Sequence, residues 1–321
     1  MKEILERAAA SPAGKELAAA AASGEVAVLK GVSGSAYALY AAAVVERRGG
    51  VHIFVCGDRD AAAYLMNDFY NLLDEKQVYF FPSSYKRSVA YGAEDAQGVV
   101  QRTAAMNAVK GFTKGYLIVC TYPEALAERV ADAETLRRDT IAVKVGDSIS
   151  IAVLEDALVD ANFTRVDFVY EPGQYSVRGG IVDVFSFSES KPYRIDFFGD
   201  EVDSIRRFNI SSQLSADKLD RVEIIPNLNA GDGAAKVSFV QFAGDAAAYW
   251  FYDADYVLRR VNDIRRKTLA DMERPEEIDR LMTSRNALLG DLANCRMLAL
   301  RDNLPERPAT AAVEFDTAPQ P

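Results

Sequence analysis

The stretch from Gly31 to Ala38 reads Gly-Val-Ser-Gly-Ser-Ala-Tyr-Ala and resembles a phosphate-binding loop in its position and glycine content. It follows an apolar run that predicts a strand and opens a segment that predicts a helix, which is the context of the motif Gly-x-x-x-x-Gly-Lys-Ser/Thr. Gly31 matches the first glycine of that motif, and Gly34 is a further glycine within the loop. Ala36 replaces the second glycine, Tyr37 replaces the lysine, and Ala38 replaces the Ser/Thr.

Each of these replacements removes something that phosphate chemistry uses. Ala36 adds a Cβ where the backbone would approach a phosphate closely. Tyr37 lacks the charge that meets the β- and γ-phosphates, and Ala38 lacks the hydroxyl that holds Mg²⁺. By analogy with an oxyanion donor, losing one such group can cost roughly 3–4 kcal/mol of transition-state stabilisation. Three interpretations stay open: a plain connecting loop, an active ATPase, and a nucleotide site that has lost its chemistry.

A second segment fits the last of these interpretations. The apolar run 246–252 ends at Asp253, and Ala254 follows it. In an ATPase the corresponding strand ends in Asp-Glu, and its aspartate helps to hold Mg²⁺. Ala254 stands where the glutamate would be, although a helix over 246–258 is also compatible with these residues.

The first third of the chain alternates strand-like and helix-like segments, which predicts a parallel, doubly wound sheet. The expected strands are 25–30, 51–56, 78–81 and 116–120. The expected helices are 35–48, 61–73 and 97–109.

The middle of the chain predicts a small antiparallel domain. After a helical pattern over 149–161, five strand-like stretches follow in quick succession: 163–170, 174–178, 181–187, 193–198 and 201–208. Gly199-Asp200 is typical of a two-residue hairpin turn between the last two of them. The last third predicts strands at 221–226, 237–242 and 311–315 and helices at 255–272 and 276–297.

The alternation from Tyr193 to Phe198 separates two faces of a strand. The side that reads as core holds Tyr193, Ile195 and Phe197; the other side holds Arg194, Asp196 and Phe198. Arg178 lies on the side opposite Tyr175 in its own strand. Arginine and aromatic residues are enriched at binding hot spots, where truncation often costs about 2 kcal/mol or more. The alternative is that Phe198 covers a minor core and that the arginines pair with Asp196 or with Asp203.

Composition and charge limit the kinds of binding site and cellular location that the chain can have. The 321 residues carry a formal net charge of −10, which disfavours overall attraction to a nucleic-acid backbone. The densest basic segment, Arg259–Lys267, is interleaved with acidic residues, so a solvated helix face is a better interpretation than a DNA-binding face. One histidine and three dispersed cysteines make a zinc site or a disulfide framework unexpected. Without a long apolar stretch, the chain is expected to be cytoplasmic and not membrane-bound.

Two stretches carry a specific resemblance. Residues 171–185 read Glu-Pro-Gly-Gln-Tyr-Ser-Val-Arg-Gly-Gly-Ile-Val-Asp-Val-Phe, and residues 192–206 read Pro-Tyr-Arg-Ile-Asp-Phe-Phe-Gly-Asp-Glu-Val-Asp-Ser-Ile-Arg. They closely resemble the second domain shared by the nucleotide-excision-repair protein UvrB and the bacterial transcription-repair coupling factor, Mfd. The loop after Gly31 and the segments 101–109 and 116–126 are similar as well, so the resemblance covers most of residues 25–225.

Departures from UvrB favour the coupling factor. UvrB has an intact loop with Lys and Thr and a long aromatic-rich hairpin that inserts into DNA. Here the loop has neither residue, and 81–91 is too short for that hairpin. The resemblance is therefore to the N-terminal, UvrB-like module of the coupling-factor family, whose members continue into an RNA-polymerase-interacting domain and translocase motors. This chain ends before any of those, so a fragment is expected.

The resemblance implies a P-loop-NTPase-like α/β fold of UvrB type, degenerate at its loop, with an inserted small antiparallel sheet-rich α+β domain. The expected domains are 1–128, 129–216 and a truncated 217–321. The fragment is expected not to be an enzyme and to need no cofactor, because ATP and Mg²⁺ would serve only the parent's motors.

The resemblance also implies partners. The second domain of the family docks the damage sensor UvrA, and the parent's own C-terminal domain is thought to cover the same surface at rest. RNA polymerase and DNA would be met through the parent's other domains. The family's UvrA-contact positions fall on Arg178, Arg194 and Phe198. The alternative is an active, UvrB-type ATP-dependent protein that processes DNA damage.

Overall fold

The computed structural model describes residues 1–23, 26–85, 95–228 and 235–317, and the chain divides into two compact units. Unit 1 comprises Met1–Ala93, Ala108–Val130 and Lys236–Pro321; unit 2 comprises Glu94–Asn107 and Ala131–Ala235. Helix α5 (Ala96–Lys110) crosses the division. Of the segment 81–91, which the sequence marks as too short for a DNA-inserting hairpin, residues 86–91 lie outside the described part of the chain.

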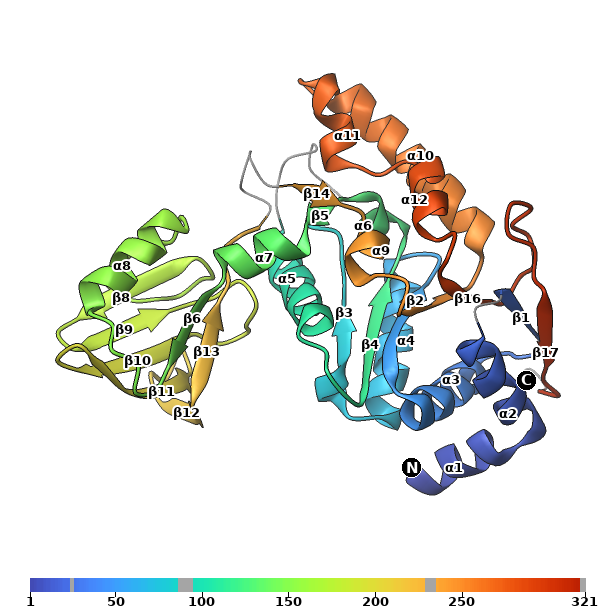
Figure 1. Ribbon diagram of the computed structural model, residues 1–321, viewed down its shortest axis with the longest axis horizontal. Helices are drawn as coiled ribbons and strands as arrows, with labels where there is room; N and C mark the ends of the chain where they lie inside the picture. The colour runs from blue at the N-terminus through green and yellow to red at the C-terminus, as the bar shows by residue number, and fades with distance from the viewer. Residues whose placement is uncertain (24–25, 86–94, 229–234, 318–321) are drawn as a thin grey trace. The chain divides into compact units, whose positions relative to one another are not determined.

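Unit 1 is built on a seven-stranded sheet in which every neighbouring pair of strands is parallel (Figure 1). Its strands, in spatial order, are β17 (Ala311–Glu314), β1 (Val26–Lys30), β16 (Arg296–Ala299), β15 (Ala248–Phe251), β2 (Gly50–Val55), β4 (Tyr116–Thr121) and β3 (Val78–Phe80). The predicted α/β class with a parallel, doubly wound sheet is confirmed. The sheet takes strands from both the first and the last third of the chain.

Two groups of helices cover this sheet. Parallel strands are joined by right-handed crossovers, so connections that run in opposite directions along the sheet place their helices on opposite faces. One group comprises α1 (Lys2–Ala10), α2 (Pro12–Ala22), α3 (Ser35–Arg48) and α4 (Arg59–Leu72), of which α3 packs on the other three. The other group comprises α6 (Pro123–Ala127), α9 (Phe239–Ala243), α10 (Ala254–Asp271), α11 (Ile278–Leu281) and α12 (Arg285–Asp291).

The single histidine, His52, is a buried part of this core. Its Nε2–H donates to Gly49 O at 3.0 Å, and its Nδ1 accepts from Trp250 Nε1 at 3.1 Å. These partners hold the neutral tautomer, because a proton on Nδ1 would face the indole N–H. Burial is the main reason that the pKa of His52 is lowered to about 4. His52 is thus a structural residue.

This histidine gives unit 1 a pH dependence with a definite sign. In the unfolded chain the imidazole titrates near 6.5, whereas in the folded chain it stays neutral down to about pH 4. The unfolded state therefore binds more protons between these values, and stability falls as the pH falls. We expect about 2 kcal/mol to be lost through His52 between pH 7.5 and pH 5. Urea titrations followed by Trp250 fluorescence measure this loss, and His52→Asn should show a pH loss smaller by that amount; an equal loss in both proteins would contradict the assignment.

Unit 2 is built on a six-stranded sheet in the order β12 (Ser215–Leu219), β11 (Glu201–Phe208), β10 (Tyr193–Phe198), β9 (Ile181–Val184), β8 (Gln174–Arg178) and β7 (Thr164–Arg165). All neighbours are antiparallel except β7 and β8. One face packs its apolar residues against α8 (Ile151–Asp160) and the strand pair β6 (Ile141–Lys144) and β13 (Arg221–Ile224). Unit 2 also contains α7 (Ala133–Asp139). The short strands β5 (Val130–Ala131) and β14 (Lys236–Val237) pair with each other; β14 belongs to unit 1, and the division between the units falls within β5.

Three predicted elements are wrong, each for a local reason. The strand expected at 237–242 is mostly helix α9, because Ser238 accepts from Gln241 N at its start and Gly244 ends it at a φ of +80°. The helix expected at 276–297 is broken into a 3₁₀ turn (Pro275–Glu277), α11, α12 and strand β16. The strand expected at 163–170 is only β7, since Asp167 O accepts from the side chains of Ser176 and Arg178 instead of a neighbouring strand.

One strand lies in a different unit from the predicted domain that contained it. Residues 221–224 were expected within a third domain over 217–321, but β13 pairs in antiparallel register with β6 in unit 2. The apolar side chains of this pair, Val143, Val222 and Ile224, belong to the core of unit 2. The described residues as far as Leu228 therefore group with the middle of the chain.

Candidate partner-binding surface and the altered phosphate loop

The loop after β1 adopts a backbone conformation that favours glycine, but three of its backbone amides already form hydrogen bonds within the chain. Gly31 adopts a φ of +75°, and a Cβ there would lie 2.2 Å from Phe315 O. The Ser33 amide donates to Thr317 Oγ1 at 3.1 Å, and the Thr317 hydroxyl donates to Gly31 O at 2.6 Å. The amides at positions 36 and 37 donate to Ser33 O and Gly34 O. Phosphate cradles rely on free amides in such a loop, and here these three already have partners.

Tyr37 and Ala38, which stand at the lysine and Ser/Thr positions of a phosphate loop, both pack against the core. The Tyr37 ring meets Phe54 edge-on at 6.3 Å between centroids. Burial around its hydroxyl raises the pKa of Tyr37 well above its ordinary value, so the side chain stays neutral. Ala38 is buried. Gly34 precedes α3 as its N-cap with a φ of +56°, and Ala36 lies in the first turn of that helix. The loop thus offers neither a cation nor a hydroxyl at the expected places.

Asp253, the candidate magnesium-binding aspartate, already has partners within the chain. The strand interpretation of the preceding run is confirmed, because β15 lies inside the parallel sheet and Asp253 follows its end. The carboxylate caps α10 by accepting from Tyr256 N at 2.8 Å. It also accepts from Asn303 Nδ2 at 2.8 Å and from Arg301 Nη1 at 3.2 Å. Ala254 is the buried first residue of α10.

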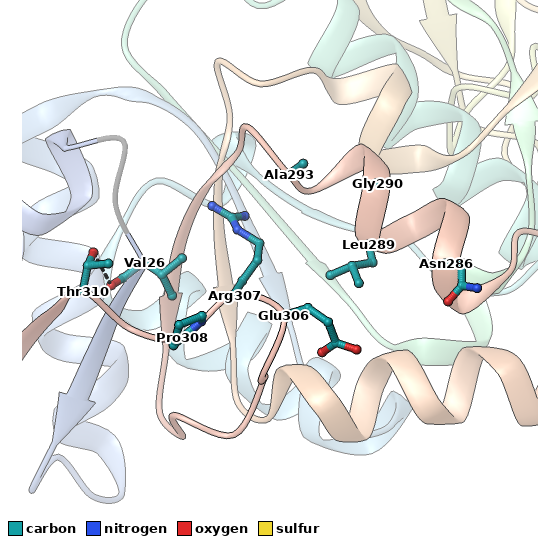
Figure 2. Close-up of a pocket in the computed structure, with 9 residues that line it drawn as sticks. All are labelled: Val26, Asn286, Leu289, Gly290, Ala293, Glu306, Arg307, Pro308 and Thr310. Atoms are coloured by element: carbon teal, nitrogen blue, oxygen red, sulfur yellow. Dashed lines mark hydrogen bonds between the residues drawn. The ribbon is translucent and has the colours of Figure 1, made fainter.

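A large open pocket lies elsewhere in unit 1, between the start of β1, the helix α12 and the segment before β17 (Figure 2). Val26 begins β1 and Thr310 precedes β17, so this pocket is at the amino end of the sheet, whereas the loop after β1 is at the carboxyl end. The guanidinium of Arg307, the cation among its lining residues, donates to the carbonyls of Leu292 and Cys295. The pocket is therefore not a displaced phosphate site.

A buried carboxylate organises the polar face of the unit 2 sheet. Asp183, in β9, lies in register with Ser176 on one neighbouring strand and with Arg194 on the other. Arg194 donates to both of its oxygens, from Nε to Oδ1 at 2.7 Å and from Nη2 to Oδ2 at 2.8 Å. Arg178 Nη2 donates to Oδ2 as well. One buried acid thus holds two of the three predicted contact residues.

The two arginines differ in what they leave exposed. The side chain of Arg194 is only 14% exposed, because its guanidinium stacks on the Phe208 ring at 4.3 Å and donates to Gln213 Oε1 at 3.1 Å. The hydrogen bond to Asp183 raises the pKa of Arg194. Arg178 is 35% exposed and stacks on Phe168 at 4.9 Å. Arg194 therefore supports the surface, and Arg178 remains accessible.

Phe198 is the most exposed large apolar side chain of the described residues, at 84%. It ends β10 and pairs with Glu201 across the predicted turn, where Gly199 has a φ of +63°. Strand alternation places Phe198 on the face that carries Arg194 and Asp183. The idea that this phenylalanine covers a minor core is wrong. Further exposed apolar side chains of unit 2 include Phe168, Tyr170 and Leu214.

The other part of that alternative, in which Arg178 and Arg194 pair with Asp196 or Asp203, is also wrong. A bulge in β11 places Asp196 opposite Ser204, so Asp196 does not face Asp203 as a plain two-residue register would require. Asp196 instead accepts from Ser204 Oγ at 2.9 Å and pairs with Arg206 at 2.8 Å. The arginines of the candidate surface pair with Asp183, a residue that strand alternation alone did not single out.

The basic segment of α10 is neutralised by its neighbours. Four of its arginines form ion pairs, namely Arg259 with Asp255, Arg260 with Glu124, Arg265 with Asp279 and Arg266 with Asp263. These contacts match the interpretation of a solvated, charge-balanced helix face. A separate finding concerns membranes: within the described residues, none of the helices combines the length and hydropathy that crossing a bilayer requires.

Comparison with known proteins agrees with this arrangement. Residues 141–229 match the family described as the UvrB interaction domain. The chain is 28% identical over 200 residues to the transcription-repair-coupling factor of Bacillus subtilis, which is 62% of this chain and 17% of that protein. It is 28% identical over 204 residues to the Escherichia coli protein of the same name, and 26% identical over 199 residues to that of Haemophilus influenzae.

The matched part spans about a sixth of the length of these relatives. The family match contains all six strands of the unit 2 sheet, including Asp183 and the three predicted contact residues. Residues 141–229 therefore match a UvrB interaction domain, and about three fifths of the chain is similar to part of the transcription-repair-coupling factors.

Proposed function

We propose that this chain is a non-catalytic docking module that recruits the damage sensor UvrA through the polar face of the unit 2 sheet. The observation that carries the proposal is Phe198, an 84% exposed phenylalanine within a matched UvrB interaction domain, on the same face of the sheet as the two arginines that bind Asp183. A partner that covers this exposed ring would gain binding free energy, because burying a Phe side chain contributes about 1.5–3 kcal/mol. The test is a titration with UvrA.

The surface has the chemistry of a protein contact. An aromatic ring and guanidinium groups are the residue types that most often dominate interfaces. Arg178 keeps part of its guanidinium accessible and would meet a carboxylate or a carbonyl of the partner. Arg194 stays bound to Asp183 and Phe208 and holds the strand beneath Phe198 in place.

The same proposal extends to the parent protein. The relatives are transcription-repair-coupling factors, of which this chain matches only part. We place the module in such a factor, where it would bring UvrA to stalled RNA polymerase on DNA. The parent's own C-terminal domain would cover the Phe198 surface at rest, and the ATP-dependent translocase motors would lie in other domains.

Absence of ATP binding is the prediction that separates this proposal from an active UvrB-type enzyme. The tied amides, the neutral Tyr37 and the buried Ala38 lead us to expect no calorimetric heat of binding up to about 1 mM Mg-ATP, a concentration where even a millimolar site would be half filled. A protein with an intact phosphate loop, titrated under the same conditions, is the positive control. Saturable binding at micromolar ATP would reverse the conclusion and favour the enzyme.

A further inference from the structure

A second, smaller pocket lies in unit 1 at the carboxyl ends of β2 and β15, with a volume of about 270 Å³. Its walls include Phe54 from β2, Trp250 from β15, and Tyr252 just after that strand. Helix α3 contributes Tyr37, the residue at the lysine position of the altered loop, and the start of α4 contributes Asp58 and Ala61.

The topology marks this place as a binding position. From β2 the chain passes through α4 to β3 at one edge of the sheet, whereas from β15 it passes through α10 to β16 in the opposite direction. The neighbouring strands β2 and β15 thus flank the point where the winding reverses. Open α/β sheets bind their ligands in the crevice outside the carboxyl ends of the strands at such a point.

The lining of this pocket is unsuited to phosphate. Trp250 stacks on Phe54 with ring centroids 5.0 Å apart, and Tyr37 contacts Phe54 edge-on, so aromatic faces and edges form the walls. None of the residues that line it is Lys or Arg. Arg301 contacts Tyr252 but is paired with Asp253. An anion would find no counter-charge here.

The charged group that the pocket does present is a carboxylate. Asp58 is exposed, and its Oδ1 accepts from Ala61 N at 2.9 Å as the N-cap of α4. Among the described residues no ion pair to Asp58 is found, so the acid can receive a cation from a ligand. Aromatic faces also attract cations, most strongly where water is partly excluded.

We propose that this pocket binds a compact aromatic ammonium compound, with the ring between Tyr37 and Tyr252 and the ammonium group at Asp58. A cavity of about 150 Å³ lined by apolar side chains accepts benzene. The larger volume here has room for two fused rings. The site occupies the sheet position that binds nucleotides in related architectures. Its lining, however, favours a cationic ligand over an anionic one.

The test uses 1-naphthylmethylammonium as the probe and the full chain as the protein. Calorimetric titration is expected to give a dissociation constant below about 1 mM, and 1-naphthoate, with the same rings and a negative charge, is expected to bind at least about tenfold more weakly. Asp58→Asn keeps a good N-cap and removes the charge, so it should weaken the ammonium probe about tenfold and leave 1-naphthylmethanol unchanged.

A second variant tests the location. Ala61 is an exposed helix residue in the pocket wall, and Ala61→Leu should fill the cavity and abolish binding while the thermal melt stays unchanged. Lack of binding of the ammonium probe up to 5 mM would overturn the proposal, as would equal affinity for naphthoate. Undiminished binding to the folded Ala61→Leu protein would also overturn it, because the probe would then occupy another place.

Discussion

Replacing Asp183 with alanine is expected to lower the free energy of unfolding of unit 2 by about 3–5 kcal/mol, the usual cost of removing one partner from a buried ion pair. The carboxylate is buried and accepts from two guanidinium groups, so its loss leaves Arg194 and Arg178 facing each other without a counter-charge. Amide hydrogen exchange of β9 and β10 measures this change locally, in the unit that contains the pair.

Asp196→Ala is the matched control. Asp196 lies on the neighbouring strand and pairs with Arg206, and these two side chains are more exposed than Asp183 and Arg194. Exposed pairs contribute about 0–1 kcal/mol, so this variant should remain close to the wild type. If the two variants lost equal stability, the buried Asp183 pairs would not be the organising contact of this face.

The same contacts change what an alanine at position 194 can show. From the strand pattern alone, Arg194→Ala is expected to remove a partner contact and leave the fold intact. In the structure that arginine neutralises Asp183 and covers Phe208, so its removal is expected to destabilise unit 2 as well. Loss of binding by that variant would not separate a contact from a support. Phe198 offers the clean test.

Phe198→Ala is expected to weaken UvrA binding about 30- to 1000-fold, which corresponds to the 2–4 kcal/mol typical of an interface hot spot. The ring is 84% exposed in the free chain, so its loss removes almost no internal packing. The unfolding free energy should therefore stay within about 0.5 kcal/mol of the wild type, as for surface substitutions in general. The ratio of the dissociation constants of variant and wild type is the quantity to measure.

Val159→Ala is the control for that experiment. Val159 is also an exposed apolar residue of unit 2, but it lies on α8, the helix that packs on the opposite face of the sheet. It should bind UvrA as the wild type does. Comparable weakening by both variants would mean that general surface hydrophobicity, and not this face, determines the affinity.

Local patterns predict the elements of this chain where one face is clearly apolar. The strands 193–198 and 201–208 and the helix 35–48 have the predicted bounds, because period-two or helical spacing and turn glycines agree there. The segment 276–297 failed because its helical spacing continues past Met282 and Ser284. At these residues a β-bridge between Met282 and Glu128 interrupts the helix, and Ser284 begins α12 as its N-cap.

The functional geometry depends on contacts that spacing along the chain does not contain. Asp183 becomes the anchor of Arg178 and Arg194 only through the register of three strands. A single acid within an otherwise apolar strand, Ile-Val-Asp-Val, was the available indication. Likewise, the loss of lysine and hydroxyl at positions 37 and 38 could be read directly, whereas the bond between Ser33 and Thr317 joins residues 284 apart.

The most direct test of the central claim is a calorimetric titration of UvrA into the wild-type chain with no nucleotide present. The account predicts saturable binding, since the docking face is formed by the folded unit 2 sheet and requires no ligand at the altered loop. It is contradicted if the folded chain binds UvrA only when ATP is added, or does not bind it at all.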